Sequence, residues 1–139
     1  MGIASSSSEN VAETIVIADD DADVRMILTD QFIAAGYTVR TAAHGAEAIA
    51  LLQEIPTPMA ILVDLMMPGI VGHSVLEYIR NERRLASARV AIISGSPELA
   101  PAGYQLFTKP VTFAQLLAFV RRPPPPPPSR PAPNSARGI

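Results

Sequence analysis

The sequence predicts an α/β fold in which a mainly parallel, doubly wound sheet carries helices on both faces. Short apolar runs of strand length alternate along the chain with helical patterns, which is typical of βαβ units. The strand runs also lack polar–apolar alternation, as expected of strands that are buried on both faces. Hydrophobic residues make up 48% of the 139 residues, which is enough for the core of one ordinary domain.

The first half of the chain predicts two strand–helix units after a polar start. Residues 1–13 are small and polar, and we expect a disordered lead-in there. Two strands and two helices follow in alternation, over 14–18 (strand), 22–35 (helix), 37–42 (strand) and 46–53 (helix). In the first helix, Val24, Ile27, Leu28 and Phe32 have helical spacing, and Gly36 supplies the stop.

The second half continues the alternation and ends in a proline-rich segment. Its predicted elements are 59–63 (strand), 74–84 (helix), 90–93 (strand), 105–108 (strand) and 112–122 (helix). Residues 123–139 contain a run of prolines and predict a polyproline II segment within a disordered tail. The chain therefore predicts one domain over residues 14–122, flanked by two disordered segments.

Polar side chains follow the predicted strands where the strands end. Asp19 and Asp20 come after the first strand, Asp64 after the third, Ser94 after the fourth, and Lys109, the only lysine, after the fifth. Parallel strands bring these ends to one edge of the sheet, where ligands bind in such folds. Clustered carboxylates repel each other unless a hard divalent ion such as Mg²⁺ lies between them. A phosphoryl group is then the natural ligand, and an aspartate can act as the nucleophile.

Helix capping is the alternative explanation for part of the acidic run. Aspartate is favoured at helix N-termini, and Asp21 is the best candidate for such a cap. Capping does not explain Asp64, which precedes Leu65 and Met66 rather than the start of a helix. Ser94 alone could be a turn residue, and Lys109 alone a solvated surface charge. Their joint placement after strands favours a functional site.

The motifs together resemble the receiver domain of two-component response regulators, of the CheY-like type, over roughly residues 14–121. The segments that carry the resemblance are Ile15–Asp21, Leu62–Gly69, Ile93–Gly95 and Thr108–Pro110. The resemblance implies a flavodoxin-like sheet of five parallel strands in the order 2-1-3-4-5. It also implies that the peptide bond between Lys109 and Pro110 is cis.

The resemblance assigns a role to each polar residue at the strand ends. Asp64 would accept the phosphoryl group, while Ser94 and Lys109 would bind its oxygens. The Mg²⁺ ligands would be Asp19, Asp20, Asp64 and the main-chain carbonyl of Met66. Neither Met66 nor Ser96 supplies a carboxylate or amide that could orient an attacking water, so we expect slow hydrolysis of the phosphorylated aspartate.

The sequence departs from the family pattern between the fourth and fifth strands. Leu106 stands where the family usually carries an aromatic switch residue, so coupling of Ser94 to an aromatic side chain is in doubt. Only 14 residues separate Ser94 from Lys109, and they include Pro97 and Pro101. This leaves room for a turn or two, and we expect a shortened or missing fourth helix.

The resemblance implies a single-domain response regulator rather than a conventional enzyme. Its partner would be a sensor histidine kinase or a histidine phosphotransfer protein, and it would signal by phosphorylation-dependent binding or in a phosphorelay. A net charge of −2, from 11 basic and 13 acidic residues, argues against a nucleic-acid partner. Neither a long apolar span nor a signal peptide is evident, so we expect a cytoplasmic protein without a membrane partner. The family also allows a homodimer.

Two other functions compete with this interpretation. A phosphatase of the haloacid dehalogenase type would use Asp21 as its nucleophile, with Ser94 and Lys109 as helpers. That class needs an acidic pair after the lysine, and no Asp or Glu follows Glu98. The second alternative is a pseudo-receiver that only binds partners, which the intact acidic set and Lys109 argue against.

Overall fold

A single parallel sheet forms the centre of the molecule. The structure is a computed structural model that describes residues 13–65 and 72–121. Its five strands lie in the order β2-β1-β3-β4-β5, and every neighbouring pair is parallel, as the sequence predicted. The strands are β1 (Thr14–Ala18), β2 (Thr38–Ala42), β3 (Ala60–Asp64), β4 (Arg89–Ser94) and β5 (Gln105–Thr108).

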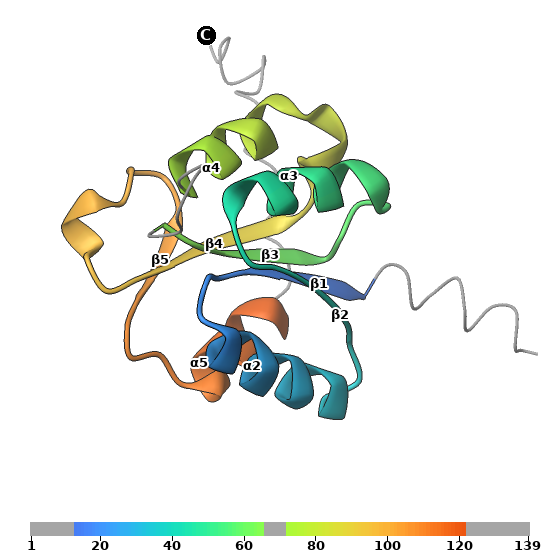
Figure 1. Ribbon diagram of the computed structural model, residues 1–139, viewed down its shortest axis with the longest axis vertical. Helices are drawn as coiled ribbons and strands as arrows, with labels where there is room; N and C mark the ends of the chain where they lie inside the picture. Colours follow the sequence, from blue (N-terminus) through green and yellow to red (C-terminus); the bar gives the residue numbers. More distant parts are fainter. Residues whose placement is uncertain (1–12, 66–71, 122–139) are drawn as a thin grey trace, which may run out of the picture.

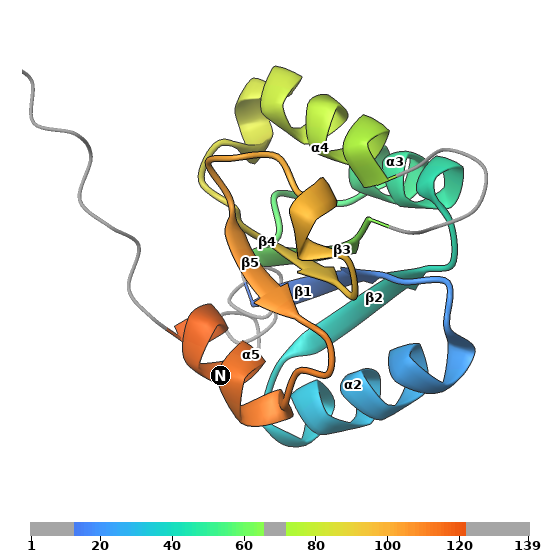
Figure 2. The same cartoon turned by 90° about the vertical axis from the view of Figure 1, so that its left-hand side faces the viewer.

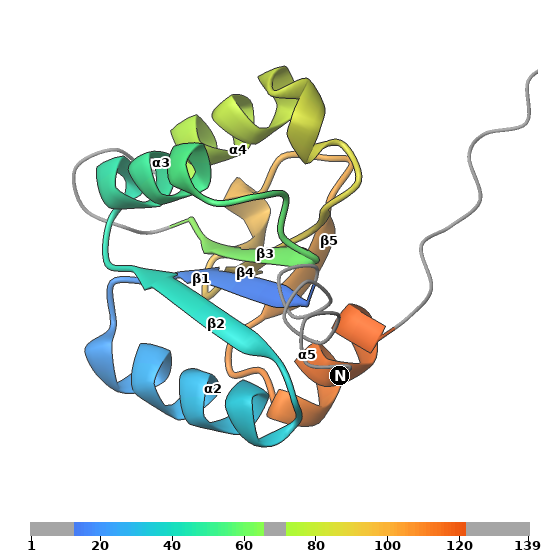
Figure 3. The ribbon, with the colours of Figure 1, turned by 90° about the vertical axis from the view of Figure 1, so that its right-hand side faces the viewer.

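Helices cover both faces of the sheet, which confirms the doubly wound arrangement. Helices α3 and α4 lie on one face, and α2 and α5 on the other (Figure 1). Figure 2 looks onto β5 and Figure 3 onto β2, and both views show the sheet between the same two helical layers. The helices are α2 (Ala22–Ala34), α3 (Gly45–Glu54), α4 (Gly72–Asn81) and α5 (Phe113–Arg121), with 3₁₀ turns η1 (Arg83–Leu85) and η2 (Pro97–Leu99).

The strand sequences explain why the sheet is buried between two helical layers. Successive side chains of a strand point to opposite faces. In β1, Val16 packs into the cluster under α3 and α4, whereas Ile15 and Ile17 pack into the cluster over α2 and α5. All five residues of β1 and all five of β3 are buried. Continuous apolar runs are therefore required, because neither face of these strands meets water.

The helix α2 forms as the sequence predicted, but its regularly spaced apolar residues are not all buried. Leu28 and Phe32, one helical turn apart, are buried, and Val24 is half-buried, but the Ile27 side chain is 54% exposed. A helix rotates by about 100° per residue, so Ile27 lies beside the buried stripe rather than on it. The Phe32 ring meets the Phe113 ring edge-on, with the two centroids 4.8 Å apart, and this contact joins α2 to α5.

The predicted helix over 74–84 ends earlier, at Asn81, and η1 follows as a separate turn. Arg84 explains this break, because its guanidinium turns to α3 and donates to the carbonyl oxygens of Leu52 and Ile55 at that helix's end. These acceptors are carbonyls that a helix terminus leaves without an internal partner. Arg84 thus fixes the connection between the two helices of one layer.

The sequence predicted that the helix between the fourth and fifth strands is shortened or missing, and this expectation is confirmed for the segment between β4 and β5. Residues 95–104 are described throughout, and their only helical element is the three-residue turn η2. Pro97 begins this turn, and Gly103 has a positive φ of 95°. An exposed hydrogen bond joins residues 95–104 to α4, because the His73 ring nitrogen Nε2 lies 3.1 Å from the Leu99 carbonyl oxygen.

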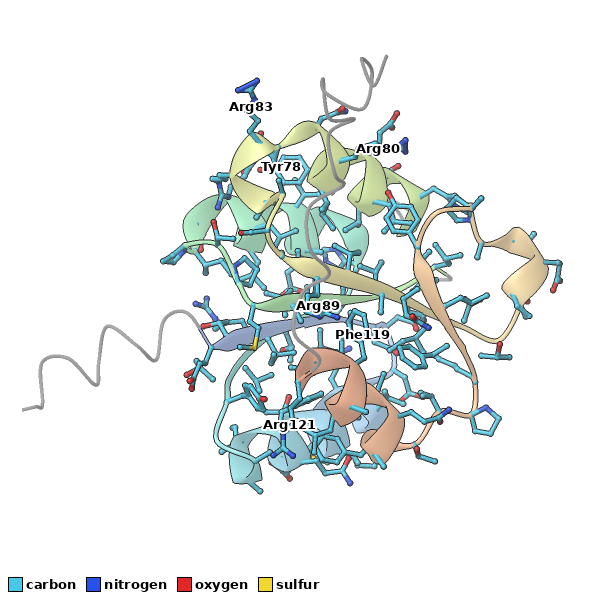
Figure 4. The ribbon with its side chains drawn as sticks, turned by 180° about the vertical axis from the view of Figure 1, so that it is seen from behind. Tyr78, Arg80, Arg83, Arg89, Phe119 and Arg121 are labelled. Carbon is cyan, nitrogen blue, oxygen red and sulfur yellow. The ribbon has the colours of Figure 1, made fainter. Side chains whose placement is uncertain are left out.

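The start of β4 is anchored on the end of α5. The Arg89 guanidinium lies over the Phe119 ring, 5.1 Å from its centroid, and its Nε donates to the Phe119 carbonyl oxygen at 3.2 Å. Figure 4 shows the two side chains together at the middle of this face, with Arg80 and Arg83 on the α4 side.

Among the described residues, no helix is long and apolar enough to cross a membrane.

Candidate functional site

Four of the predicted site residues lie at the carboxyl ends of neighbouring strands. Asp19 follows β1 and Asp64 ends β3, the strand paired with it. Ser94 ends β4 and Lys109 follows β5, and the Lys109 main-chain N–H donates to the Ser94 carbonyl oxygen at 2.9 Å. The parallel sheet therefore brings residues from distant parts of the sequence to one edge, as the sequence predicted.

Lys109 makes ion pairs with two buried carboxylates. Its Nζ lies 3.2 Å from Asp64 Oδ2 and 3.5 Å from Asp19 Oδ2. Asp19 is 2% exposed and Asp64 is 3% exposed, while the Lys109 side chain is half-buried. Charges interact more strongly in such a shielded place than in water. Lys109 therefore offsets much of the repulsion between the two carboxylates.

Three carboxylates lie close enough to share a metal ion. Asp19, Asp20 and Asp64 each place one oxygen within 4.8 Å of the other two, and Asp20 is the exposed member. Hard divalent ions such as Mg²⁺ and Ca²⁺ prefer oxygen ligands at about 2.0–2.6 Å. This donor set fits such an ion. The fourth ligand expected from the sequence, the main-chain carbonyl of Met66, lies outside the described residues.

The pKa of Asp19 reflects the crowding of negative charge. Burial raises the pKa of this carboxyl above its ordinary value of 3.8, and the charge of Asp64 adds to the increase. The Asp21 amide, which donates to Asp19 Oδ1 at 2.9 Å, and the Lys109 ammonium offset part of it. The charged form of Asp19 is thus disfavoured in the metal-free protein, and a bound cation would remove that cost.

The pKa of Lys109 moves in the direction that keeps it charged. Burial alone would lower the pKa of this amine, but the negative charges of Asp19 and Asp64 outweigh burial and raise it. The ammonium is therefore the form present at neutral pH. The peptide bond between Lys109 and Pro110 is cis, as the family resemblance implied.

Ser94 lies completely buried at the end of β4. Its Oγ accepts a hydrogen bond from the Ser96 main-chain N–H at 2.9 Å. A serine hydroxyl accepts and donates at the same time, so this bond leaves its proton for another acceptor. Asp64 pairs with Ile93 in the register of β3 and β4, one residue before Ser94. Ser94 is thus one residue closer to the carboxyl-end edge of the sheet than the position paired with Asp64.

Asp21 serves the helix rather than the site, as the capping alternative predicted. Its Oδ1 accepts from the main-chain N–H groups of Asp23 at 2.9 Å and Val24 at 3.2 Å, which makes it the N-cap of α2. The Asp21 side chain is exposed and lies outside the group of three clustered carboxylates. A phosphatase with Asp21 as its nucleophile gains no support from this geometry.

A cleft of about 630 Å³ opens beside the ion pairs, between α2 and the segment after β5. Asp19 and Lys109 line one part of it, and Leu28, Pro110 and Phe113 line another. The cleft therefore joins charged groups of the site to an apolar wall.

One contact at the site was not predicted. The Arg25 guanidinium, on α2, donates from Nη1 to the main-chain carbonyl oxygen of Asp19 at 2.8 Å. Helical side chains point back toward the helix N-terminus, so a long donor early in α2 can reach the strand end before it. That directional rule is the one sequence signal that could have indicated this contact.

Leu106 stands at the position where the family usually carries an aromatic switch residue. The aromatic residues near it in sequence pack on opposite faces of the sheet. Leu106 and Tyr104 pack against the cluster under α3 and α4, whereas Phe107 packs against the opposite cluster. Phe107 therefore points away from the Leu106 side. Phe107 thus does not replace the missing switch residue, and the aromatic side chain on the Leu106 face is that of Tyr104, just before β5.

Comparisons with known proteins agree with the fold. The family model described as the response regulator receiver domain matches residues 15–121. The receiver domain of the hybrid histidine kinase CckA has 30% sequence identity and a TM-score of 0.67, covering 78% of this chain and 95% of that one. The response regulator TrrA of Thermotoga maritima, solved with Mg²⁺ and BeF, has 23% identity and a TM-score of 0.67 over 78% of this chain and 96% of that one.

Curated relatives are longer than this chain. The transcriptional regulatory protein GltR of Pseudomonas aeruginosa is 31% identical over 115 residues, which are 78% of this chain and 47% of that protein. The chain thus spans less than half the length of such relatives, and the likeness concerns their receiver portion. Because the family model covers most of the chain and the strand-end residues lie where the fold requires them, the chain belongs to the response regulator receiver domains of two-component systems.

Proposed function

We propose that Asp64 accepts a phosphoryl group from a phosphohistidine of a sensor histidine kinase or a histidine phosphotransfer protein. The observation that carries this proposal is the Lys109 ammonium, 3.2 Å from Asp64 Oδ2, in a buried group of carboxylates. A carboxylate is a weak nucleophile, so transfer depends on neutralising the charge around the phosphoryl oxygens. The Lys109 charge is already in place for that task.

The transfer itself is a simple displacement. An Asp64 carboxylate oxygen bonds to phosphorus, the phosphorus–nitrogen bond to the donor imidazole breaks, and the imidazole leaves with the electron pair. Lys109 then pairs with a phosphoryl oxygen, and the Ser94 hydroxyl donates a hydrogen bond to another. Ser94 can do so while still accepting from the Ser96 N–H, at 2.9 Å, so its movement would pull on the segment that follows β4.

We propose Mg²⁺ as the ion held by Asp19, Asp20 and Asp64. The close carboxylate oxygens and the raised pKa of Asp19 support a divalent cation there, and TrrA, which has a similar fold, was solved in complex with Mg²⁺ and BeF. When bound, the ion supplies positive charge that offsets the carboxylates and the incoming phosphoryl oxygens. The contribution of the Met66 carbonyl stays a prediction.

The output of the domain is proposed to be phosphorylation-dependent protein binding or onward phosphotransfer. Receiver domains are signalling modules, whereas relatives such as GltR are named transcriptional regulators and extend well beyond this match. Several points stay predictions. They are that the protein has a single domain, that it binds neither nucleic acid nor a membrane, that it is cytoplasmic, and that it can form a homodimer.

Mass spectrometry with a small phosphodonor and Mg²⁺ tests the proposed chemistry. We expect a single adduct of about 80 Da, the mass of one phosphoryl group, which is stable in acid and labile in base. Asp64→Asn should abolish it, and the control Asp30→Asn, at an exposed acid on α2, should keep it. Failure of the wild-type protein to form the adduct would contradict the proposal. Rapid multiple-turnover release that depends on Asp21 would favour the phosphatase instead.

A further inference from the structure

We infer that Arg25 is a positioning residue for the metal site, which it serves through the main chain without binding the ion. This inference rests on the proposed function, because it takes Asp19, Asp20 and Asp64 as the Mg²⁺ ligands. The observation behind it is the hydrogen bond of 2.8 Å from Arg25 Nη1 to the Asp19 carbonyl oxygen.

The Asp19 carbonyl is at the place where the sheet stops. The register of β1 with β2 and with β3 ends at Ala18, and the Asp19 N–H still donates to the Ala42 carbonyl oxygen at 3.0 Å. The Asp19 carbonyl oxygen comes next, in a residue that is 2% exposed. A buried carbonyl needs a donor, and the Arg25 guanidinium supplies one.

This bond adds to hydrogen bonds that hold both the side chain and the main chain of Asp19. Its side chain accepts from the Asp21 N–H at one oxygen and from Lys109 at the other, while Arg25 fixes its carbonyl. The same carbonyl belongs to the peptide group that leads into Asp20. Holding that peptide plane therefore sets the direction in which the exposed Asp20 carboxylate leaves the chain, toward the oxygens of Asp19 and Asp64.

The charge of Arg25 and its hydrogen bond have opposite effects on a cation. A guanidinium near the site repels Mg²⁺, so its removal should tighten binding if charge alone mattered. If the hydrogen bond positions the ligands, its removal should weaken binding, as happens when partners of metal ligands are lost. The sign of the change in Mg²⁺ affinity thus separates the two effects.

Titration of ¹⁵N,¹³C-labelled protein with MgCl₂, followed by NMR at the amides of residues 19–21, tests the inference. We expect Arg25→Met to raise the dissociation constant for Mg²⁺ about tenfold, the lower end of the usual effect of such partners. The metal-free Arg25→Met protein should also show an upfield shift of the Asp19 carbonyl ¹³C signal, which reports the lost hydrogen bond. Arg25→Lys should restore part of the affinity, because its ammonium can donate to the same oxygen.

Arg80→Met is the matched control, since it removes the same charge from an exposed position on α4 (Figure 4). It should leave the dissociation constant within about twofold of wild type, the spread expected of an exposed charge far from the site. If Arg25→Met does not fold, Arg25→Gln provides the neutral variant, and its shorter side chain also loses the bond.

Three results would overturn the inference. They are an unchanged dissociation constant in the neutral variant, a lower one, and binding by Arg25→Lys that is no better than that of Arg25→Met. In all three the wild-type protein binds Mg²⁺, so the proposed function stands. A wild-type protein that binds no Mg²⁺ would instead contradict the proposed function on which the inference depends.

Discussion

At the scale of single residues, the negative charge collected at the site is unfavourable for the stability of the metal-free protein. Burial and Asp64 both raise the pKa of Asp19, and the half-buried Lys109 offsets only part of this. Groups assembled for function often lower the stability of a protein in this way. The free energy of unfolding of the metal-free protein should therefore respond to the loss of one site carboxylate.

We predict that Asp64→Asn stabilises the metal-free protein near neutral pH. Asparagine keeps the shape and an oxygen for Lys109 but removes the repulsion with Asp19. The expected gain is about 1 kcal/mol, or about 4 °C in the unfolding midpoint. With Mg²⁺ at ten times its dissociation constant, the wild-type protein should gain about 1.4 kcal/mol and the order should reverse. Calorimetry with EDTA and with Mg²⁺ measures both, and a less stable Asp64→Asn in EDTA would contradict the prediction.

We predict that Lys109→Met slows phosphorylation of Asp64 without preventing Mg²⁺ binding. The variant loses the cation that stabilises charge on the phosphoryl oxygens, and loss of one such group usually costs about 10²–10³-fold in rate. Mg²⁺ binding should stay equal or become tighter, because the competing ammonium is gone. Initial rates of adduct formation provide the measurement. A rate within threefold of wild type would remove Lys109 from the proposed chemistry.

At the scale of elements, the connection between β4 and β5 distinguishes this domain from its family. It carries the single turn η2 in place of a helix, and Leu99 on that turn is 49% exposed. The turn is tied to Ser94 through the Ser96 N–H and to α4 through His73. A movement of Ser94 would thus reach η2 directly, without the aromatic side chain that Leu106 replaces.

We predict that His73→Ala loosens η2 while the core stays intact. The exposed hydrogen bond to the Leu99 carbonyl oxygen is worth about 1 kcal/mol, so amide hydrogen exchange in the turn should speed up about fivefold. The Leu99 and Ala100 amides, which close the turn, are the reporters, and the Ile92 amide in the core serves as the control. Unchanged exchange at both reporters would show that the imidazole does not hold the turn.

At the scale of the whole molecule, the fold follows from patterns that act over short stretches of sequence. The apolar runs of β1 and β3 predicted strands buried on both faces, and all ten of their residues are buried. The polar residues after the strands predicted one edge as the site, because parallel topology fixes where those ends meet. Both predictions needed only the periodicity of each element and the connection rule.

Contacts between elements could not be predicted in this way. His73 and Leu99 are 26 positions apart, and Arg84 reaches the carbonyl of Leu52 across 32 positions. Such bonds depend on how helices are rotated and placed, and the same holds for the exposure of Ile27, which its helical spacing alone does not indicate. The early end of α4 at Asn81 has the same origin, since Arg84 leaves the helical pattern to cap α3.

We predict that residues 13–121 fold as an independent unit. They contain the sheet, both helical layers and the clustered carboxylates, and the family model covers nearly the same range. The fragment should unfold cooperatively, within about 4 °C of the full chain, a difference worth about 1 kcal/mol. Calorimetry of both proteins checks this, with Mg²⁺ expected to raise both midpoints equally. Loss of cooperative unfolding in the fragment would show that the flanking segments contribute to the domain.

Lys109 has a practical consequence because no other residue in the chain is a lysine. Only the neutral form of an amine attacks an acylating reagent, so the carboxylates that raise the pKa of Lys109 also protect it from acylation. The only side-chain amine of the protein is therefore a built-in reporter. Its rate of acylation follows the electrostatic state of the carboxylates beside it, and mass spectrometry can read that rate from unlabelled protein.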